Sequence, residues 1–466
     1  MTRKILKPLL LASVASLGLI GSTLAVSAET LADALVSAYR NSHLLEQNRA
    51  TLRAADEDVA QAVSDLRPVL QWTANYGYTK NDATAATYKA AGRTYDRLTA
   101  YSSLVASVTL FDFGRGRLAV DMKKEAVLST REGLRSVEQQ VLLSAISAYT
   151  SVKSTAEQVA INENSVRVIG EQLKAAQDRF DVGEVTKTDV SQAEASLAGA
   201  RASLAAARGN YQIARESYKA AIGHYPEKLS ALPKAPVLPK TLDTARTTAL
   251  RAHPSIKQAQ HSVSLAELSV SAAVAERLPE IDGSASFTVY ERGTKNTAAG
   301  VGLTQTIYAG GKLSSVHRQA IAGRDQAKAA LREAGVEVSD AVAQAWASID
   351  VYRAQIRAYD EQIQAADIAY KGVKEEATLG ARTTLDVLDA EQTLLDARAS
   401  RITAEADLQV GYYSLLSAMG LLTVEDLKLG IPTYDPAGYY NAVQKAPITS
   451  VQGKSLDRVL SAIGKN

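Results

Sequence analysis

The sequence predicts a mainly α-helical, elongated protein with a smaller membrane β component, built as two tandem repeats. Two stretches of about 66 residues carry apolar side chains at coiled-coil spacing, 25 residues in seven steps. Before each stretch, two segments alternate apolar and polar residues, as β-strands do. After each stretch comes the same Gly–Thr–Asp pattern, whose glycines, Gly183 and Gly380, lie 197 residues apart (380 − 183). A long internal repeat of this kind predicts one elongated object rather than several compact domains.

Residues 1–28 have the features of a secretory signal peptide. Three basic residues precede an apolar run over 9–20, and a Val-Ser-Ala sequence ends at Ala28, before Glu29. We therefore expect cleavage before Glu29 and export of the chain. A membrane anchor is the alternative, but the run is short of the roughly 20 residues that a spanning helix needs. The chain contains no Cys, which excludes disulfides and thiolate metal sites.

Composition argues against two other classes of function. The formal net charge of +2 falls to −1 (2 − 3) once the three basic residues of the signal peptide are removed. This near-neutral balance predicts no nucleic-acid partner. The five His residues are scattered, and neither His-Glu-x-x-His nor Gly-x-Ser-x-Gly occurs. We therefore expect no enzyme activity, no cofactor and no metal site.

The first structural repeat is expected over residues 29–240. Its helical spacing begins at 30 and stops before Pro68, and its long helix starts near Arg115. Pro residues crowd its last segment, which is typical of a linker. The expected order is a helix over 30–66, a β-hairpin over about 69–113 with an exposed polar loop over 81–97, a long helix over 115–180, a hairpin tip over about 181–189, a short helix over 188–222 and a Pro-rich linker over 223–240.

The second structural repeat, over residues 241–420, follows the same plan. Gly310 is expected to correspond to Gly114, and Ile307 to lie in the returning strand. The expected order is a helix over 241–278, a β-hairpin over about 280–309, a long helix to about 378, a hairpin tip over about 378–386 and a short helix over 385–419. Residues 421–466 have weak periodicity and are expected to form a C-terminal equatorial or tail segment, packed around the outside or partly mobile.

The alternating segments predict strands with one apolar-aromatic face and one polar face. At about 11 residues the first is long enough to cross a membrane at a tilt. Four strands cannot close, whereas three protomers would supply 12, an even number known for membrane barrels. The alternative for the aromatic face is a soluble sheet packed on a core. The residues expected to face lipid are Trp72, Tyr76, Tyr78 and Phe287; those expected to face water are Gln71, Thr73, Asn75, Ser284 and Ser286.

The repeated tip stretch resembles the paired hairpin-tip motifs of the TolC family of outer-membrane efflux channels. Residues 182–189 read Val-Gly-Glu-Val-Thr-Lys-Thr-Asp, and residues 379–386 read Leu-Gly-Ala-Arg-Thr-Thr-Leu-Asp. The resemblance covers nearly the whole mature chain. It implies a homotrimer in which a shared 12-stranded β-barrel sits on an α-helical tunnel across the periplasm of a Gram-negative bacterium. It also implies an exit duct for efflux, recruited by a periplasmic adaptor (membrane fusion) protein and an inner-membrane pump.

The resemblance also implies roles for tip residues. Asp386 and Asp389 would form acidic rings at the periplasmic entrance, where like charges raise one another's pKa and attract cations. Asp189 and Arg382 would pair as a latch between hairpins, and an exposed ion pair of about 0–1 kcal/mol is easily broken. Ala377 stands where many relatives carry a latch Tyr. The residues matching the adaptor-contact surface are Val182, Gly183, Thr186, Leu379, Gly380 and Thr383.

Two other functions remain open on the sequence. An exit duct for type I protein secretion would have the same architecture, and one protein can serve both routes. A periplasmic coiled-coil scaffold without a pore would leave the amphipathic strands unexplained. Heat-modifiable migration, or recovery in the outer-membrane fraction, distinguishes a channel from such a scaffold.

Overall fold

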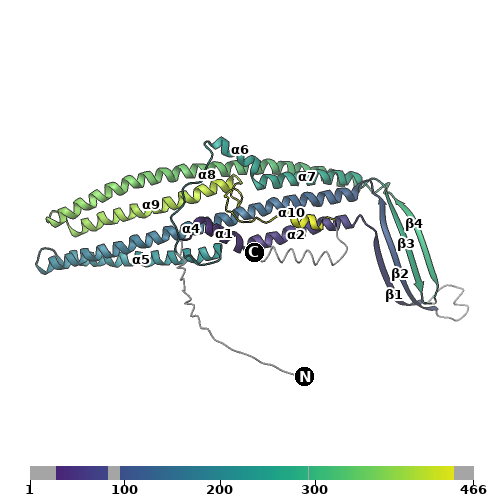
Figure 1. Cartoon of the computed structure of the whole chain (residues 1–466), viewed down its shortest axis with the longest axis horizontal. Coiled ribbons are helices and arrows are strands. Elements are labelled where there is room, and N and C mark those ends of the chain that lie inside the picture. Colours follow the sequence, from purple (N-terminus) through teal and green to yellow (C-terminus); the bar gives the residue numbers. More distant parts are fainter. Residues whose placement is uncertain (1–27, 82–94, 292, 446–466) are drawn as a thin grey trace, which may run out of the picture.

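The structure, a computed structural model, describes residues 28–81, 95–291 and 293–445. The molecule is long and narrow, with a small sheet at one end and two helical hairpin tips at the other (Figure 1). The expected signal peptide, apart from Ala28, lies outside the described residues. So do residues 82–94 of the expected polar loop and residues 446–466 of the C-terminal segment.

Both repeats fold into the same series of elements, and the two long helices have the same length of 67 residues. The mainly helical fold and the two hairpins are therefore confirmed. The first repeat contains α1 (Leu31–Asn41), α2 (His43–Ser64), β1 (Val69–Asn81), β2 (Tyr95–Phe111), α4 (Arg115–Asp181) and α5 (Lys187–Ile222). The second contains α6 (Leu242–Ala252), α7 (Pro254–Ala275), β3 (Glu280–Tyr290), β4 (Lys295–Thr304), α8 (Lys312–Thr378) and α9 (Thr384–Ala418), and α10 (Pro436–Val443) follows.

The single helices expected over 30–66 and 241–278 are wrong, because each is interrupted once. Ser42 has extended backbone, and its Oγ accepts a hydrogen bond from the Leu45 amide to begin α2. His253 is extended in the same way before Pro254, the first residue of α7. Proline lacks the amide that would continue the preceding helix, and it disfavours helical backbone in the residue before it. The two breaks fall at corresponding places in the two repeats.

Strand bounds also differ from expectation. The loop expected over 81–97 is wrong at both ends, since β1 includes Asn81 and β2 begins at Tyr95. Strand β4 ends at Thr304, so Ile307 lies beyond the strand, with 92% of its surface exposed. Gly311 rather than Gly310 corresponds to Gly114, because each precedes the first residue of a long helix at φ 88°. That offset of 197 (311 − 114) equals the offset between the tips.

The four strands form one antiparallel sheet in the order β1-β2-β3-β4, so the hairpins of the two repeats join through β2 and β3. The register aligns side chains of one kind across strands. Trp72 is opposite Leu104, which is opposite Phe287. One residue further along, Thr73, Ser103 and Thr288 are aligned, and the hydroxyls of Ser103 and Thr288 are 2.9 Å apart. Because paired residues share a face, the alternation read in each strand produces one apolar and one polar face.

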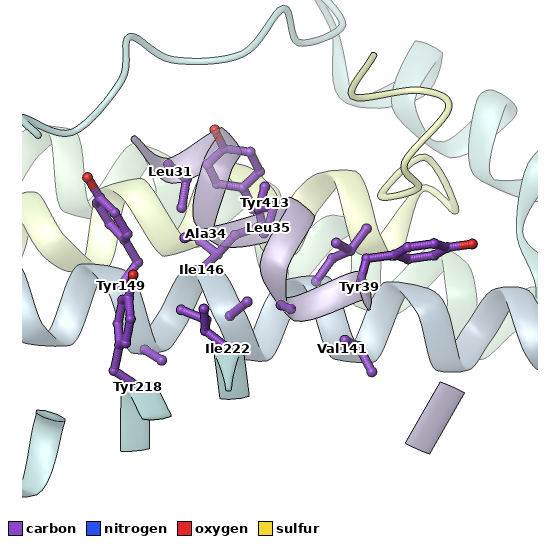
Figure 2. Packing of buried hydrophobic residues seen from close by; sticks show 14 of the residues in the cluster. Leu31, Ala34, Leu35, Tyr39, Val141, Ile146, Tyr149, Tyr218, Ile222 and Tyr413 are labelled. Carbon is purple, nitrogen blue, oxygen red and sulfur yellow. The ribbon is translucent and has the colours of Figure 1, made fainter. Parts of the chain in front are cut away.

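The largest core lies midway along the helices, where α1 packs against α4 and α5 (Figure 2). Tyr149 and Tyr218 are fully buried there, and the Tyr149 hydroxyl donates to the carbonyls of Glu29 and Ser230, each at 3.0 Å. Leucines of the linker and of the segment after α9 pack around the same cluster. The described connecting segments therefore pack around the middle of the molecule.

Candidate functional site: the hairpin tips and the sheet

The first tip reverses the chain between α4 and α5. Gly183 follows the end of α4 at φ 80°, a backbone conformation that only glycine adopts without strain, and its amide donates to the Phe180 carbonyl at 2.9 Å. Helix α5 then begins with a capping box. The Thr186 amide donates to Asp189 Oδ2 at 2.9 Å, and the Asp189 amide donates to Thr186 Oγ1 at 3.4 Å. These bonds satisfy amides that the start of a helix leaves unpaired.

The second tip repeats this geometry between α8 and α9. Gly380 has φ 78°, and its amide donates to the Ala377 carbonyl at 3.2 Å. Thr383 and Asp386 form the second capping box. The Thr383 amide donates to Asp386 Oδ2 at 2.9 Å, and the Asp386 amide donates to Thr383 Oγ1 at 3.2 Å. The two tips are therefore the same local structure made twice, as their sequences predict.

The second capping box binds one of the two acids expected at the entrance, Asp386. Hydrogen bonds from the amide and hydroxyl of Thr383 hold the pKa of Asp386 below its usual value. The rise in pKa expected from repulsion belongs to a ring of three copies, and it stays a prediction. Asp389 makes no such contact and instead lines a groove between α4, α5 and α9. Asp386 and Asp389 thus differ in surroundings, although they are three residues apart on one helix.

The proposed latch partners do not pair with each other within the described part of the single chain. Arg382 Nε donates to Glu376 Oε2 at 2.9 Å, and this exposed ion pair raises the pKa of Arg382. The Asp189 carboxylate accepts from Thr186, which lowers its pKa. A pairing of Asp189 with Arg382 across neighbouring copies remains a prediction. Glu376 is a partner that the sequence motif did not indicate.

A contact between the two tips was also missed by sequence reasoning. Arg179, in the last turn of α4, donates from Nη1 to the Ala377 carbonyl at 3.2 Å, in the last turn of α8. A cation at the C-terminal end of a helix also interacts favourably with the helix dipole. This side chain of the first hairpin therefore contacts the second hairpin at Ala377. The motif gave no signal for it, because α8 is far from Arg179 in sequence.

All six residues expected to contact an adaptor are exposed. Val182 and Leu379 are the large apolar ones among them, with 71% and 85% of their surfaces accessible. Each sits directly before the glycine that reverses the chain. The tips thus present two apolar side chains to solvent at equivalent positions.

At the other end of the molecule, the apolar face of the sheet is exposed. Trp72, Tyr76, Tyr78 and Phe287 all lie on the surface of the single chain, and Trp72 exposes 70% of its area. Trp72 Nε1 donates to Ser102 Oγ at 2.9 Å, so its polar atom is satisfied while its ring remains accessible. Leu70, Val301 and Leu303 extend the same face. A face of this kind requires a cover of lipid or protein.

The part of the chain that the structure describes lacks two features, a membrane-spanning helix and a metal-binding cluster. None of the helices there combines the length and apolar character needed to cross a lipid bilayer. No group of three or more His, Cys, Asp or Glu side chains that could hold a metal ion occurs in the same parts of the chain.

Comparison with known proteins places the chain in a family. The family model described as outer membrane efflux protein matches residues 34–224 and 245–421. The outer membrane efflux protein BepC of Brucella suis biovar 1 (strain 1330) is 36% identical over 448 residues, covering 95% of this chain and 96% of the relative. The outer membrane protein TolC of Escherichia coli (strain K12) is 27% identical over 435 residues, covering 88% of this chain and 87% of the relative.

A secretion protein and a solved structure are also similar. The alkaline protease secretion protein AprF of Pseudomonas aeruginosa (strain PAO1) is 26% identical over 384 residues, covering 78% of this chain and 79% of the relative. A crystal structure of CusC has the same fold, with a TM-score of 0.74 at 19% identity over 84% of this chain and 91% of that chain. The chain therefore belongs to the outer membrane efflux protein family and is an outer-membrane exit channel of the TolC type.

Proposed function

We propose that three copies of this chain form one exit duct for efflux, gated at the helical tips and recruited by a periplasmic adaptor protein and an inner-membrane pump. One observation carries the proposal. One series of elements joins an exposed apolar sheet face at one end to two helical hairpin tips at the other (Figure 1). On the order of 100 Å of helix separates the two ends, which suits a duct that leaves a membrane and crosses a periplasm.

The unpaired edges of the sheet support the proposed assembly of three copies. Its outer strands, β1 and β4, each have one edge without a partner strand among the described residues. Unpaired strand edges cannot be tolerated in lipid, so the edges must meet those of other copies. Three four-stranded sheets would close as 12 strands, with the face of Trp72, Leu104 and Phe287 toward lipid. The polar row of Thr73, Ser103 and Thr288 would then face water.

The tips support the gate. In a trimer, Asp386 and Asp389 would each occur three times around the entrance, and a ring of carboxylates favours cations. Arg382, exposed and held by Glu376 within one chain, would be free to exchange to Asp189 of a neighbouring copy. Pairs this exposed are worth about 0–1 kcal/mol, so an adaptor that binds the tips could displace them.

Ion selectivity in planar bilayers tests the acidic entrance. We expect the wild-type channel to prefer cations and the Asp386→Asn, Asp389→Asn double variant to lose that preference. Asparagine keeps an oxygen that can accept the capping bonds of Thr383, so the tip should stay folded. Glu375→Asn is the matched control, an exposed acid near the same tip, and should keep the preference. Unchanged selectivity in the double variant would remove the acidic rings.

Conductance tests the latch. Arg382→Ser removes the guanidinium but leaves both capping boxes intact, and we expect it to raise single-channel conductance. Arg201→Ser, an exposed arginine on α5, is the control and should conduct as the wild type does. Equal conductance in all three proteins would mean that Arg382 does not hold the entrance.

Type I protein secretion is the second candidate, favoured by the similarity to AprF, whose name states protease secretion. Deleting the gene distinguishes the two routes when small compounds inside the cells and secreted proteins in the medium are both measured. Accumulation of small toxic compounds inside the cells supports efflux, whereas loss of a secreted protein from the medium supports secretion.

A further inference from the structure

A buried acid lies at the contact between the two hairpins, a short distance above the tips. Glu391 is on α9, seven residues after the first residue of that helix (391 − 384), and only 4% of its surface is exposed. Its Oε2 atom has no hydrogen-bond partner in the described structure. A buried carboxylate without a partner is costly when ionised. Neither the capping boxes nor the acidic entrance uses this residue.

The groups around Glu391 come from both hairpins. From α8, Lys374 and Tyr370 face it, with the Lys374 ammonium 5.8 Å from the centre of the Tyr370 ring. From α4, Arg167 and Glu171 face it, and these two are bound to each other at 2.8 Å. Helix α5 approaches this part of α9 with apolar Ala193 and Leu197, which pack on Leu388.

The cations near Glu391 are therefore engaged elsewhere. Arg167 donates to Glu171 and, from Nη2, to Asn164 at 2.8 Å, while Lys374 lies over an aromatic ring. Burial consequently outweighs the attraction of Lys374 and Arg167 and raises the pKa of Glu391 to about 7. The carboxyl therefore gains or loses its proton near neutral pH.

We propose that Glu391 makes the contact between the two hairpins proton-dependent, so that its protonated carboxyl allows α9 to pack on α4 and its ionisation loosens that packing. The residue would then set how readily the tips separate. This proposal rests on the gate proposed above, and it concerns a residue outside the tip motif.

The direction follows from linkage. The packed state raises the pKa of Glu391 from the usual value of 4.5 to about 7, so it binds the proton more tightly than the separated state does. Packing is favoured fully below about pH 4.5 and is progressively weakened as the pH rises toward 7. Hairpin separation should therefore increase from acid to neutral and alkaline pH. Asp386 has a lowered pKa and remains ionised over this range.

Distance measurements between the tips test the proposal directly. The chain has no native Cys that would also be labelled. Spin labels therefore attach only at two introduced cysteines, Val182→Cys and Leu379→Cys, at exposed tip positions of the two hairpins. In the detergent-solubilised full-length protein, we expect the population with separated labels to increase severalfold between about pH 5.5 and about pH 8. In the Glu391→Gln variant, which keeps the shape but not the charge, the packed population should persist at both pH values.

The control and a second variant keep the test decisive. Glu375→Gln removes an exposed acid from the same end of the molecule and should retain the pH response. Glu391→Met supplies a neutral side chain of similar length if the amide disturbs packing, and should also abolish the response. A pH response that survives in both Glu391 variants overturns the proposal. The proposed function fails separately, if the wild-type protein forms no channel in bilayers.

Discussion

Arg179 shows, at the scale of single residues, how the tip depends on contacts between hairpins. Replacing it with Ala removes the bond to the Ala377 carbonyl, a loss of about 0.5–1.5 kcal/mol for a hydrogen bond of this kind. Because the bond joins α4 to α8, we expect Arg179→Ala to raise resting conductance in planar bilayers. Arg201→Ala, exposed on α5, should not change it. Identical traces for the two variants would show that Arg179 contributes nothing to closure.

Asp56 on α2 is a second residue with a testable pH dependence. It is fully buried, neither carboxylate oxygen has a partner within the described parts of the chain, and burial raises its pKa to about 6. The folded state therefore loses stability as the pH rises from about 3.8 through 6. Asp56→Asn should raise the free energy of unfolding by about 2–3 kcal/mol at pH 8 and change it little at pH 4.

Urea unfolding at the two pH values measures this effect. The exposed Asp58→Asn, on the same helix, is the control and should show no such pH dependence, since its ion pair with Lys123 is on the surface. If Asp56→Asn is destabilising at both pH values, the carboxylate has a role in the fold that the structure does not show.

Residue identity at the tips could be predicted from the sequence, whereas residue environment could not. The Gly, Thr and Asp of each tip act locally, within a few positions of one another, so their spacing carries the information. Glu391 and Arg179 matter because of α4 and α8, helices that approach them only in the folded chain. No local pattern marks either residue.

At the scale of elements, each tip depends on a glycine with positive φ. Gly380→Ala should lower stability by about 1–2 kcal/mol, because a Cβ is strained in the left-handed region even though the surrounding space is open. Gly199→Ala is the matched control, since Gly199 also has open space around it but lies inside helix α5. There alanine should stabilise the protein by about 0.5–1 kcal/mol. Thermal unfolding midpoints that shift in the same direction for both variants would contradict this account.

Helix and strand bounds show which local signals were decisive. The ends of α4, α5, α8 and α9 fall within one or two residues of expectation, because glycines and capping boxes mark them. The breaks at Ser42 and His253 were missed, although Pro254 is a local signal that could have found the second. The extension of β2 back to Tyr95 has no apolar alternation to reveal it and depends on pairing with β1.

At the scale of the whole molecule, the internal repeat explains why one chain has two β-hairpins, two long helices and two tips. The helix pairs, strand pairs and tips recur in order, and the two halves join along β2–β3 and where α4 packs against α7 and α9 (Figure 1). Elongation follows, since coiled-coil hairpins of this length have no compact arrangement. The sequence predicted this shape from periodicity, but the order of the strands and the contact between hairpins required the structure.

Single-channel recording of the purified full-length protein in planar bilayers tests the central claim, that copies of this chain enclose a gated pore. The account predicts discrete, cation-selective conductance steps that become larger in Arg382→Ser, from a species that runs as a trimer before heating and as a monomer afterwards. A monomer that stays in water and produces no conductance steps would contradict it.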